Sequence, residues 1–236
     1  MKIIKIIIFK FFALFGYSLI NLANEEKHRV KLWSGLLPGE IRSIFQYEMF
    51  LKTLSLSGNI VECGVATGRR LSFFKNLQKE HNCMRNLWGF DSFEGFSKGH
   101  VKDGNYFNSR QDSYNQKYST YSLDFVKRNL VALCGEDAAP EISLIKGWIP
   151  KSFDSYDGSS ISLINLDLDI YEPTKETLNF FWPFLQVNGI VLLDEYDFYL
   201  DTIKFPGSKR AIDEFCKDKN ITVTKHYTGK YYIQKL

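Results

Sequence analysis

The sequence predicts an α/β fold: a doubly wound, mostly parallel, Rossmann-like sheet with an antiparallel C-terminal hairpin strand. Short apolar runs alternate with amphipathic helical patterns along the chain, without internal repeats. The later runs are continuously apolar, which is typical of parallel strands that helices cover on both faces. Two short apolar segments flank Thr228-Gly229, which indicates a hairpin that closes the sheet edge.

The elements are predicted in a regular order. A helix over 40–54 ends at Ser57-Gly58, a strand covers 59–63, and the next helix begins at about Arg69. Further strands are predicted at 86–91, 142–146, 161–167 and 189–194, further helices at 123–133, 175–185 and 208–217, and hairpin strands at 221–224 and 231–234. The polar stretch over 97–121 has the composition of a mobile lid that hydrogen-bonds its ligand, and a plain loop is the alternative.

Residues 29–236 are expected to form one domain, which follows an apolar N-terminal helical segment, residues 1–28. Residues 1–23 are mostly apolar apart from a few lysines and small polar residues. The lysines argue against a membrane-spanning helix, and the residues after Asn21 make a poor signal-peptide cleavage site. Two interpretations stay open: a helix that packs on this domain or on a second subunit of a homo-oligomer, or a segment that rests on a membrane surface.

Composition excludes several classes of partner and site. The 30 basic and 27 acidic residues give a net charge of only +3, and no basic face is present, so nucleic acid is not an expected partner. The cysteines lack CxxC spacing and nearby paired histidines, which argues against a zinc site and a disulfide framework. A cytoplasmic location is expected, with membrane association left open by the N-terminal segment.

Polar residues at the ends of the predicted parallel strands mark the expected binding site. Carboxylates end four of the five strands: Glu62, Asp91, Asp167, and Asp194 with Glu195. Burying a carboxylate at the end of an apolar strand is costly unless something binds it. Because an open parallel sheet binds its ligands beyond the carboxyl ends of its strands, we expect a ligand site at this edge.

A glycine turn follows the first of these strands. Gly64 and Gly68 have three residues between them, unlike the G-x-G-x-x-G loop that binds a pyrophosphate, so a nicotinamide dehydrogenase is disfavoured. Glu62 before the turn suits a ligand with an ammonium group, and Asp91 at the next strand end can accept both hydroxyls of a ribose. S-adenosylmethionine carries these groups. The structural alternative is that the two glycines only shape a sharp turn between strand and helix.

Six sequence blocks occur in order and carry a family resemblance. They are Val61-Glu-Cys-Gly-Val-Ala-Thr-Gly, Gly89-Phe-Asp-Ser-Phe-Glu-Gly-Phe, Lys146-Gly-Trp, Asp167-Leu-Asp-Ile-Tyr-Glu-Pro-Thr, Asp194-Glu-Tyr and Phe205-Pro-Gly-Ser-Lys-Arg-Ala-Ile-Asp-Glu-Phe. Over about residues 29–217 the chain resembles the class I S-adenosylmethionine-dependent methyltransferases, and more narrowly the macrocin O-methyltransferase family. The resemblance implies methyl transfer to a hydroxyl of a sugar, glycan precursor or glycosylated metabolite, a cofactor at Glu62, Gly64 and Asp91, and a divalent ion, usually Mg²⁺.

We assign a set of residues to S-adenosylmethionine on these grounds. The cofactor-binding residues are Glu62, Gly64, Val65, Gly68, Asp91, Ser92, Gly147 and Trp148. Trp148 has two interpretations, because its indole can pack on the adenine or in the protein core.

The far strand ends are predicted to hold the catalytic metal. A metal bound to the acceptor oxygen lowers its pKa and orients it for displacement at the methyl carbon. Asp167, Asp194 and Glu195 are predicted as hard oxygen ligands of Mg²⁺, with Asp167 and Asp194 also named as catalytic residues. The family carries Asp-Asp where this chain has Asp194-Glu195, which predicts a shifted or weaker ion. The alternative is that these acids cap helices or pair with basic side chains.

A general base and a rival function complete the expectations. No histidine sits in a recognisable constellation, and His100 is predicted as the nearest candidate for the base, against the alternative of a solvated loop side chain. The rival function is a non-catalytic scaffold with the cofactor fold, docked at a membrane through the N-terminal segment.

Overall fold

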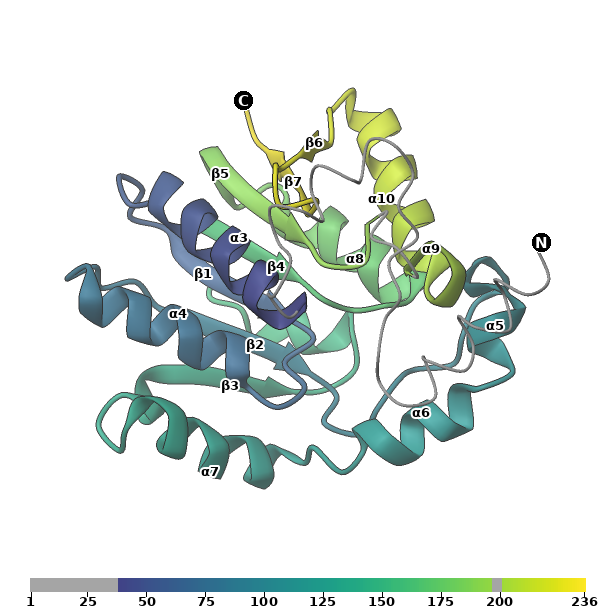
Figure 1. Cartoon of the computed structure of the whole chain (residues 1–236), viewed down its shortest axis with the longest axis horizontal. Coiled ribbons are helices and arrows are strands. Elements are labelled where there is room, and N and C mark those ends of the chain that lie inside the picture. The colour runs from purple at the N-terminus through teal and green to yellow at the C-terminus, as the bar shows by residue number, and fades with distance from the viewer. Residues whose placement is uncertain (1–37, 197–200) are drawn as a thin grey trace, which may run out of the picture. The chain divides into compact units, whose positions relative to one another are not determined.

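A single sheet in the order β3-β2-β1-β4-β5-β7-β6 organises this computed structural model, which describes residues 38–196 and 201–236. The strands are β1 (Asn59–Cys63), β2 (Leu87–Asp91), β3 (Ile142–Lys146), β4 (Ile161–Leu166), β5 (Leu185–Leu193), β6 (Thr224–Lys225) and β7 (Tyr231–Gln234). β1 to β5 are parallel, and β7 pairs antiparallel with β5 and β6 (Figure 1). The predicted parallel sheet with a C-terminal hairpin is confirmed.

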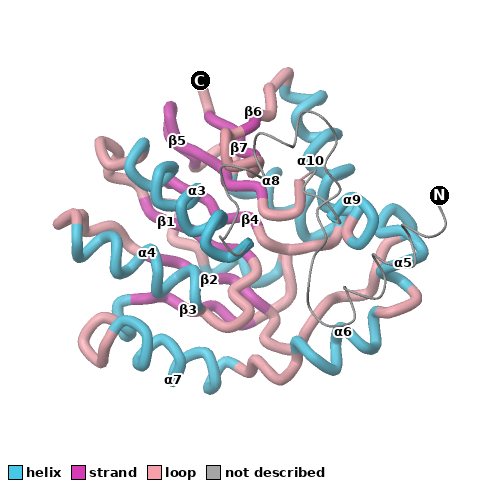
Figure 2. Tube along the Cα trace, viewed as in Figure 1, coloured by secondary structure: helices cyan, strands magenta, loops and turns pink. Residues whose placement is uncertain are grey.

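Helices alternate with the parallel strands, as the amphipathic patterns predict (Figure 2). They are α3 (Pro38–Lys52), α4 (Arg69–Glu80), α5 (Gly104–Asn108), α6 (Gln111–Tyr118), α7 (Leu123–Cys134), α8 (Tyr171–Phe181), α9 (Asp201–Lys204) and α10 (Pro206–Lys219), with the 3-10 helices η1 (Val101–Asp103), η2 (Ala139–Glu141) and η3 (Lys151–Ser155). The start predicted for α8, at Lys175, is wrong, because Pro173 lies within its first turn, where a missing N–H costs no helical hydrogen bond.

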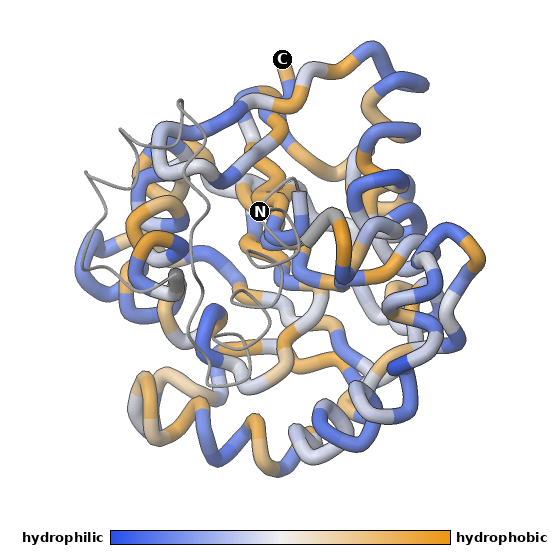
Figure 3. The backbone as a smooth tube through the Cα atoms, turned by 45° about the vertical axis from the view of Figure 1, so that its right-hand side comes forward, coloured by the Kyte–Doolittle hydropathy of each residue, from blue (hydrophilic) through white to orange (hydrophobic). Residues whose placement is uncertain are grey.

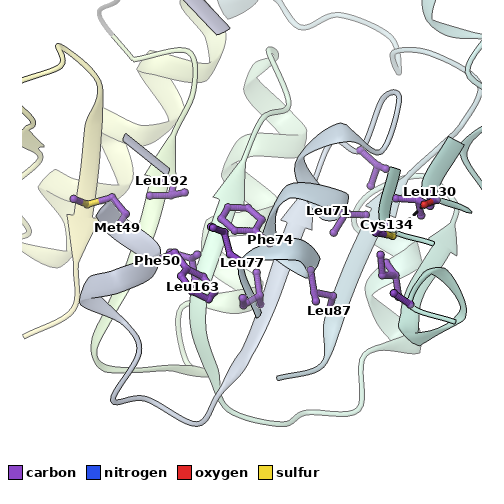
Figure 4. Close-up of a cluster of buried hydrophobic side chains, with 14 of the residues drawn as sticks. Met49, Phe50, Leu71, Phe74, Leu77, Leu87, Leu130, Cys134, Leu163 and Leu192 are labelled. Carbon is purple, nitrogen blue, oxygen red and sulfur yellow. Dashed lines mark hydrogen bonds between the residues drawn. The ribbon is translucent and has the colours of Figure 1, made fainter. Parts of the chain in front are cut away.

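Two hydrophobic clusters cover the two faces of the sheet. Phe50 of α3 and Phe74 of α4 belong to the first cluster (Figure 4), and Phe181 of α8 belongs to the second. Successive strand residues point to opposite faces, so Ile60 joins the first cluster and Val61 the second. Figure 3 shows the helices alternating between apolar and polar along their length. Burial on both faces explains why the strands read as continuous apolar runs.

The strand order reverses between β1 and β4, which are neighbours in the sheet. The chain leaves β1 at Gly64 and leaves β4 at Asp167, and the Asp167 N–H donates to the carbonyl of Cys63 over 3.0 Å. A doubly wound sheet binds its ligands outside the carboxyl ends of the strands at such a reversal. Helices α5 and α6 lie beyond this edge (Figure 1).

Residues 97–121, predicted as a polar lid or a plain loop, form η1, α5 and α6, so the plain-loop alternative is wrong. Phe107 is fully buried and stacks on Tyr114, with ring centroids 5.7 Å apart. Phe205, which precedes α10, lies 5.7 Å from Tyr114. The rings of Phe96 and Tyr118 meet edge to face at 5.1 Å. These aromatic contacts order the segment, which we call the cover.

The C-terminal hairpin is joined to α3 by a polar cluster around the buried side chain of His226. Nε2 of His226 lies 2.9 Å from Oε2 of Glu48, and Nδ1 lies 2.8 Å from the hydroxyl of Thr228. The hydroxyl of Tyr227 donates to the other oxygen of Glu48. Burial lowers the pKa of His226, and the Glu48 carboxylate opposes that shift. The turn of the hairpin is therefore held by a histidine whose neutral form is favoured by burial.

This cluster predicts a pH-dependent stability. The unfolded chain takes up a proton at His226 more readily than the folded chain, so stability is lost as the pH falls below the ordinary value of 6.5. We expect the wild type to lose more thermal stability between about pH 7.5 and about pH 5 than His226→Gln does. Melting curves across this range check it, and equal losses in the two proteins would contradict it.

The predicted boundary between residues 28 and 29 and the apolar segment, residues 1–23, lie outside the described residues. The helix-packing, homo-oligomer and membrane-surface interpretations therefore stay predictions. Within 38–196 and 201–236, no helix combines the length and apolarity needed to cross a bilayer. All four cysteines are free thiols, and all but Cys83 are buried.

Candidate active site

Three carboxylates come together beyond β4 and β5. Asp167, Asp194 and Glu195 each offer an oxygen, and these oxygens all lie within 4.8 Å of one another. The two strand ends are adjacent, because the Asp194 N–H donates to the carbonyl of Leu166 over 3.1 Å. The structure thus brings the three predicted ligands into one group, which we call the carboxylate triad. Their role as metal ligands stays a prediction.

Glu195 is the most constrained member of the triad. It is 5% exposed, and its Oε2 has no hydrogen-bond partner within the described part of the chain. Burial, followed by the charges of Asp167 and Asp194, raises the pKa of Glu195 well above its ordinary value. A buried carboxylate oxygen without a partner, facing two more carboxylates, is what a hard divalent cation would satisfy. The donor set therefore fits Mg²⁺.

Lys230 is a component of this site that the sequence analysis missed. Its side chain is buried at 3% exposure, and Nζ donates to the carbonyl of Asp194 over 2.9 Å and to Oδ1 of Asp194 over 3.1 Å. The antiparallel register of β5 and β7, which pairs Leu193 with Tyr231, brings the two residues side by side. No local motif could signal the contact, because it depends on the hairpin folding back on β5.

The cover reaches the carboxylate triad through α6. Burial, with added repulsion from Asp169, Asp167 and Glu195, raises the pKa of Tyr118. The Tyr118 phenol therefore lies in the electrostatic field of the triad. Asp169 has a positive φ of 63°, a strained backbone conformation for a non-glycine residue that is typical of functional sites.

Glu62 lies at the end of β1 and is 1% exposed. Its Oε1 accepts a hydrogen bond of 2.8 Å from the amide of Asn165, whose own oxygen accepts one of 3.2 Å from Gln46. Its Oε2 has no partner among the described residues. Burial, followed by the charge of Asp167, raises the pKa of Glu62. Asn165 was missed because it stands in the middle of an apolar run and meets Glu62 only through the β1–β4 register.

Asp91 closes the glycine turn with its carboxylate. Oδ2 accepts the backbone N–H groups of Val65 and Ala66 at 2.8 and 3.0 Å, and Oδ1 accepts that of Phe93 at 2.8 Å. The side chain of Val65 is buried. Glu62 and Asp91 stand near the ends of paired neighbouring strands, because β1 and β2 pair with Glu62 opposite Gly89. Asp91 thus shapes the turn. Its contact with a ribose stays a prediction, and would be an additional role of the same side chain.

The two glycines of the turn have a packing requirement. A Cβ on Gly64, where φ is +90°, would lie 1.7 Å from the carbonyl oxygen of Asp167. A Cβ on Gly68, where φ is +79°, would meet Val126 and Leu130 of α7 at 3.0 and 3.1 Å. Both glycines are therefore needed to form the turn between strand and helix, as the structural alternative predicts. Their contact with a cofactor stays a prediction.

The remaining predicted cofactor residues follow the ends of β2 and β3. The Gly147 N–H donates to the carbonyl of Asp91 over 2.9 Å, which joins the β2 and β3 edges. Trp148 is 42% exposed, so the core alternative for its indole is wrong. Ser92 is buried, and its hydroxyl donates to the carbonyl of Gly95 over 2.6 Å. Gly147 and Trp148 stand next to Asp91, on the side of the sheet edge away from the triad.

His100 caps η1 in the cover. Its Nδ1 accepts the backbone N–H of Lys102 at 3.1 Å, and its ring stacks on Tyr171 with centroids 5.0 Å apart. Its Nε2 lies 3.9 Å from Glu172. These contacts give the ring a structural task at the start of α8. The general-base role of His100 stays a prediction.

Residues 49–228 match the family described as Macrocin-O-methyltransferase (TylF). The chain is 25% identical over 164 residues to demethyldecarbamoylnovobiocin O-methyltransferase of Streptomyces niveus, covering 68% of this chain and 59% of that protein. It is 26% identical over 181 residues to 8-demethyl-8-(2,3-dimethoxy-alpha-L-rhamnosyl)-tetracenomycin-C 4'-O-methyltransferase of Streptomyces olivaceus, covering 75% and 60%. The chain therefore spans about three fifths of the length of these curated relatives.

Solved structures show the same fold. The O-methyltransferase NovP superposes with a TM-score of 0.69 at 21% identity, covering 83% of this chain and 79% of NovP. The calicheamicin methyltransferase CalS11 superposes with a TM-score of 0.64 at 22% identity, covering 92% and 95%. The sheet is thus that of the methyltransferase fold. Because the family match contains the glycine turn, Asp91 and the whole carboxylate triad, the chain belongs to the TylF macrocin O-methyltransferase family.

Proposed function

We propose that the protein is an S-adenosylmethionine-dependent O-methyltransferase that acts on a hydroxyl of a sugar, glycan precursor or glycosylated metabolite, assisted by Mg²⁺. The observation that carries the proposal is the placing of two chemistries at one sheet edge. The glycine turn with Glu62 and Asp91 lies on one side of the strand reversal, and the carboxylate triad lies on the other. Methyl transfer to an alcohol needs both a donor site and a means to deprotonate the acceptor.

The relatives support the substrate class. The name of the Streptomyces olivaceus protein gives methylation at a 4' oxygen of a rhamnosyl compound, and CalS11 is also described as a TDP-rhamnose 3'-O-methyltransferase. A cytoplasmic location is part of the proposal, because free thiols suit a reducing compartment. Membrane association or a homo-oligomer, each formed through residues 1–23, stays a prediction.

The glycine-turn acids, the carboxylate triad and the cover have separate roles in the proposed reaction. When bound, S-adenosylmethionine supplies the electrophilic methyl carbon and Mg²⁺ lowers the pKa of the acceptor hydroxyl. Glu62 and Asp91 would bind the ammonium and ribose groups of the cofactor, and Asp167, Asp194 and Glu195 would hold the ion. The cover would exclude water and contact the acceptor. His100 is the candidate for accepting the acceptor's proton.

Calorimetry with S-adenosylmethionine tests the donor site. We expect wild type to bind and Asp91→Asn to bind about tenfold more weakly or worse, because hydrogen bonds to a charged acceptor are lost. Asp157→Asn, in an exposed loop where Oδ1 accepts the N–H of Ser159, is the matched control and should bind as wild type does. Melting curves separate loss of the site from loss of the fold. No binding by the folded wild type would end the proposal.

A further inference from the structure

A fixed positive charge touches the carboxylate triad. The Lys230 ammonium bonds to Oδ1 and to the carbonyl of Asp194, and both side chains are at least nine-tenths buried. Few charged side chains are buried to this degree unless they are paired. The pair therefore takes up one oxygen of Asp194 and places a cation beside the oxygens that would hold a metal.

The hairpin holds Lys230 in this position from several directions. The His226 N–H donates to the carbonyl of Lys230 over 2.8 Å, and the Gly229 N–H donates to the carbonyl of His226 over 2.9 Å, which closes the turn. His226 is itself bound to Glu48 of α3. On the other side, β7 is paired with β5, the strand that directly precedes Asp194. Hydrogen bonds and strand pairing thus fix the backbone at Lys230 and hold its ammonium beside Asp194.

Two charges of the same sign beside one carboxylate repel each other. A divalent cation on the triad would share Asp194 with the ammonium, and in a buried site this repulsion is screened far less than at the surface. The same ammonium lowers the cost of keeping the carboxylates together when no ion is bound. Lys230 therefore acts in opposite directions on the ion-free and the ion-bound protein.

We propose that Lys230 is a built-in counter-ion of the carboxylate triad: it positions Asp194 in the ion-free protein and weakens the binding of a divalent cation. This inference rests on the proposed function of the triad as a metal site. It makes the C-terminal hairpin a part of the active site, which sets how readily the ion exchanges. Lys230 is a positioning residue and takes no part in the transfer itself.

The test compares metal binding by full-length variants at one neutral pH. Lys230→Met removes the charge and keeps the length of the side chain, and Lys230→Arg keeps the charge. Lys225→Met is the control, because Lys225 is an exposed lysine of the same hairpin, and its Nζ lies 5.5 Å from the ring centroid of Tyr231. Calorimetry with Mg²⁺ and with Mn²⁺ gives the dissociation constants. Melting curves with and without the ion give the ion-induced shift.

We expect Lys230→Met to bind the ion about tenfold more tightly or better, to melt lower than wild type without it, and to show the larger ion-induced shift. Lys230→Arg and Lys225→Met should bind as wild type does. A merely structural lysine would give weaker binding in Lys230→Met, so equal or weaker binding overturns the proposal. Lys230→Met that folds only in the presence of the ion supports it, and failure to fold even with the ion overturns it.

The failure of the metal site itself has a different signature. If neither wild type nor any variant binds Mg²⁺ or Mn²⁺ while S-adenosylmethionine still binds, the metal part of the proposed function falls together with the counter-ion proposal. If wild type binds the ion and Lys230→Met does not bind it more tightly, only the counter-ion proposal falls.

Discussion

Gly64→Ala is expected to lower the free energy of unfolding by about 4 kcal/mol, which is roughly half of the unfolding free energy of a typical domain. The positive φ of 90° alone costs an alanine about 1–3 kcal/mol. The added Cβ would also lie 1.7 Å from the carbonyl oxygen of Asp167, which is backbone and cannot rotate away. Overpacking of this kind adds about 1–3 kcal/mol. Denaturant unfolding measures the loss.

Gly135→Ala is the matched control for this prediction. Gly135 has a φ of +94°, close to that of Gly64, but a Cβ there would meet nothing within 4 Å. We expect it to lose only the backbone part, so that the difference between the two variants reports the clash with Asp167. Equal losses would show that the β1 and β4 ends can separate freely, and the packing explanation for Gly64 would be wrong.

Asp167→Asn is expected to lower kcat/KM for methyl transfer by about 100-fold or more. The substitution removes a charged oxygen ligand from the proposed Mg²⁺ site, and the ion would no longer be held to lower the pKa of the acceptor hydroxyl. Asparagine has the same size, so the backbone contact between Asp167 and Gly64 is kept. The ion-induced rise in melting temperature should disappear as well. Steady-state kinetics with and without a chelator, together with melting curves, check both effects.

Asp218→Asn serves as the control, because Asp218 is an exposed acid at the end of α10, 3.2 Å from Lys219. It should keep the activity and the ion response of wild type. Full activity of Asp167→Asn, unchanged by the chelator, would remove the metal from the mechanism. The donor site would then stand on the calorimetry with S-adenosylmethionine alone.

Both predictions concern the contact between Gly64 and Asp167, which the sequence did not reveal. The bounds of β1, β3 and β7 were predicted correctly, because each is a short apolar run closed by polar residues or turns. The start of α8 and the helices of the cover were not. The start of α8 was placed too late because Pro173 is tolerated in its first turn. The helices of the cover depend on aromatic partners far apart in the chain, such as Phe107 and Phe205, whose ring centroids lie 6.2 Å apart. A local pattern cannot report such a partner.

The same division holds for the site. Glu62, Asp91 and the carboxylate triad were predicted because the carboxyl ends of parallel strands meet at one edge whatever the loops do. Lys230 and Asn165 were missed, since they reach their acidic partners across 36 and 103 residues of sequence. Their partners are selected by strand register, which a single sequence does not display.

The sequence by itself determined the class of fold, the edge that carries the chemistry and the acidic residues gathered there, because these follow from hydrophobic periodicity and the cost of burying charge. Only the tertiary structure decided which charges neutralise one another. Lys230 comes to Asp194 through the antiparallel pairing of β7 with β5, and Gly64 is required by the carbonyl of Asp167 on the neighbouring strand end. Burial and charge pairing at this edge depend on the contacts that close the fold, and those contacts are long-range.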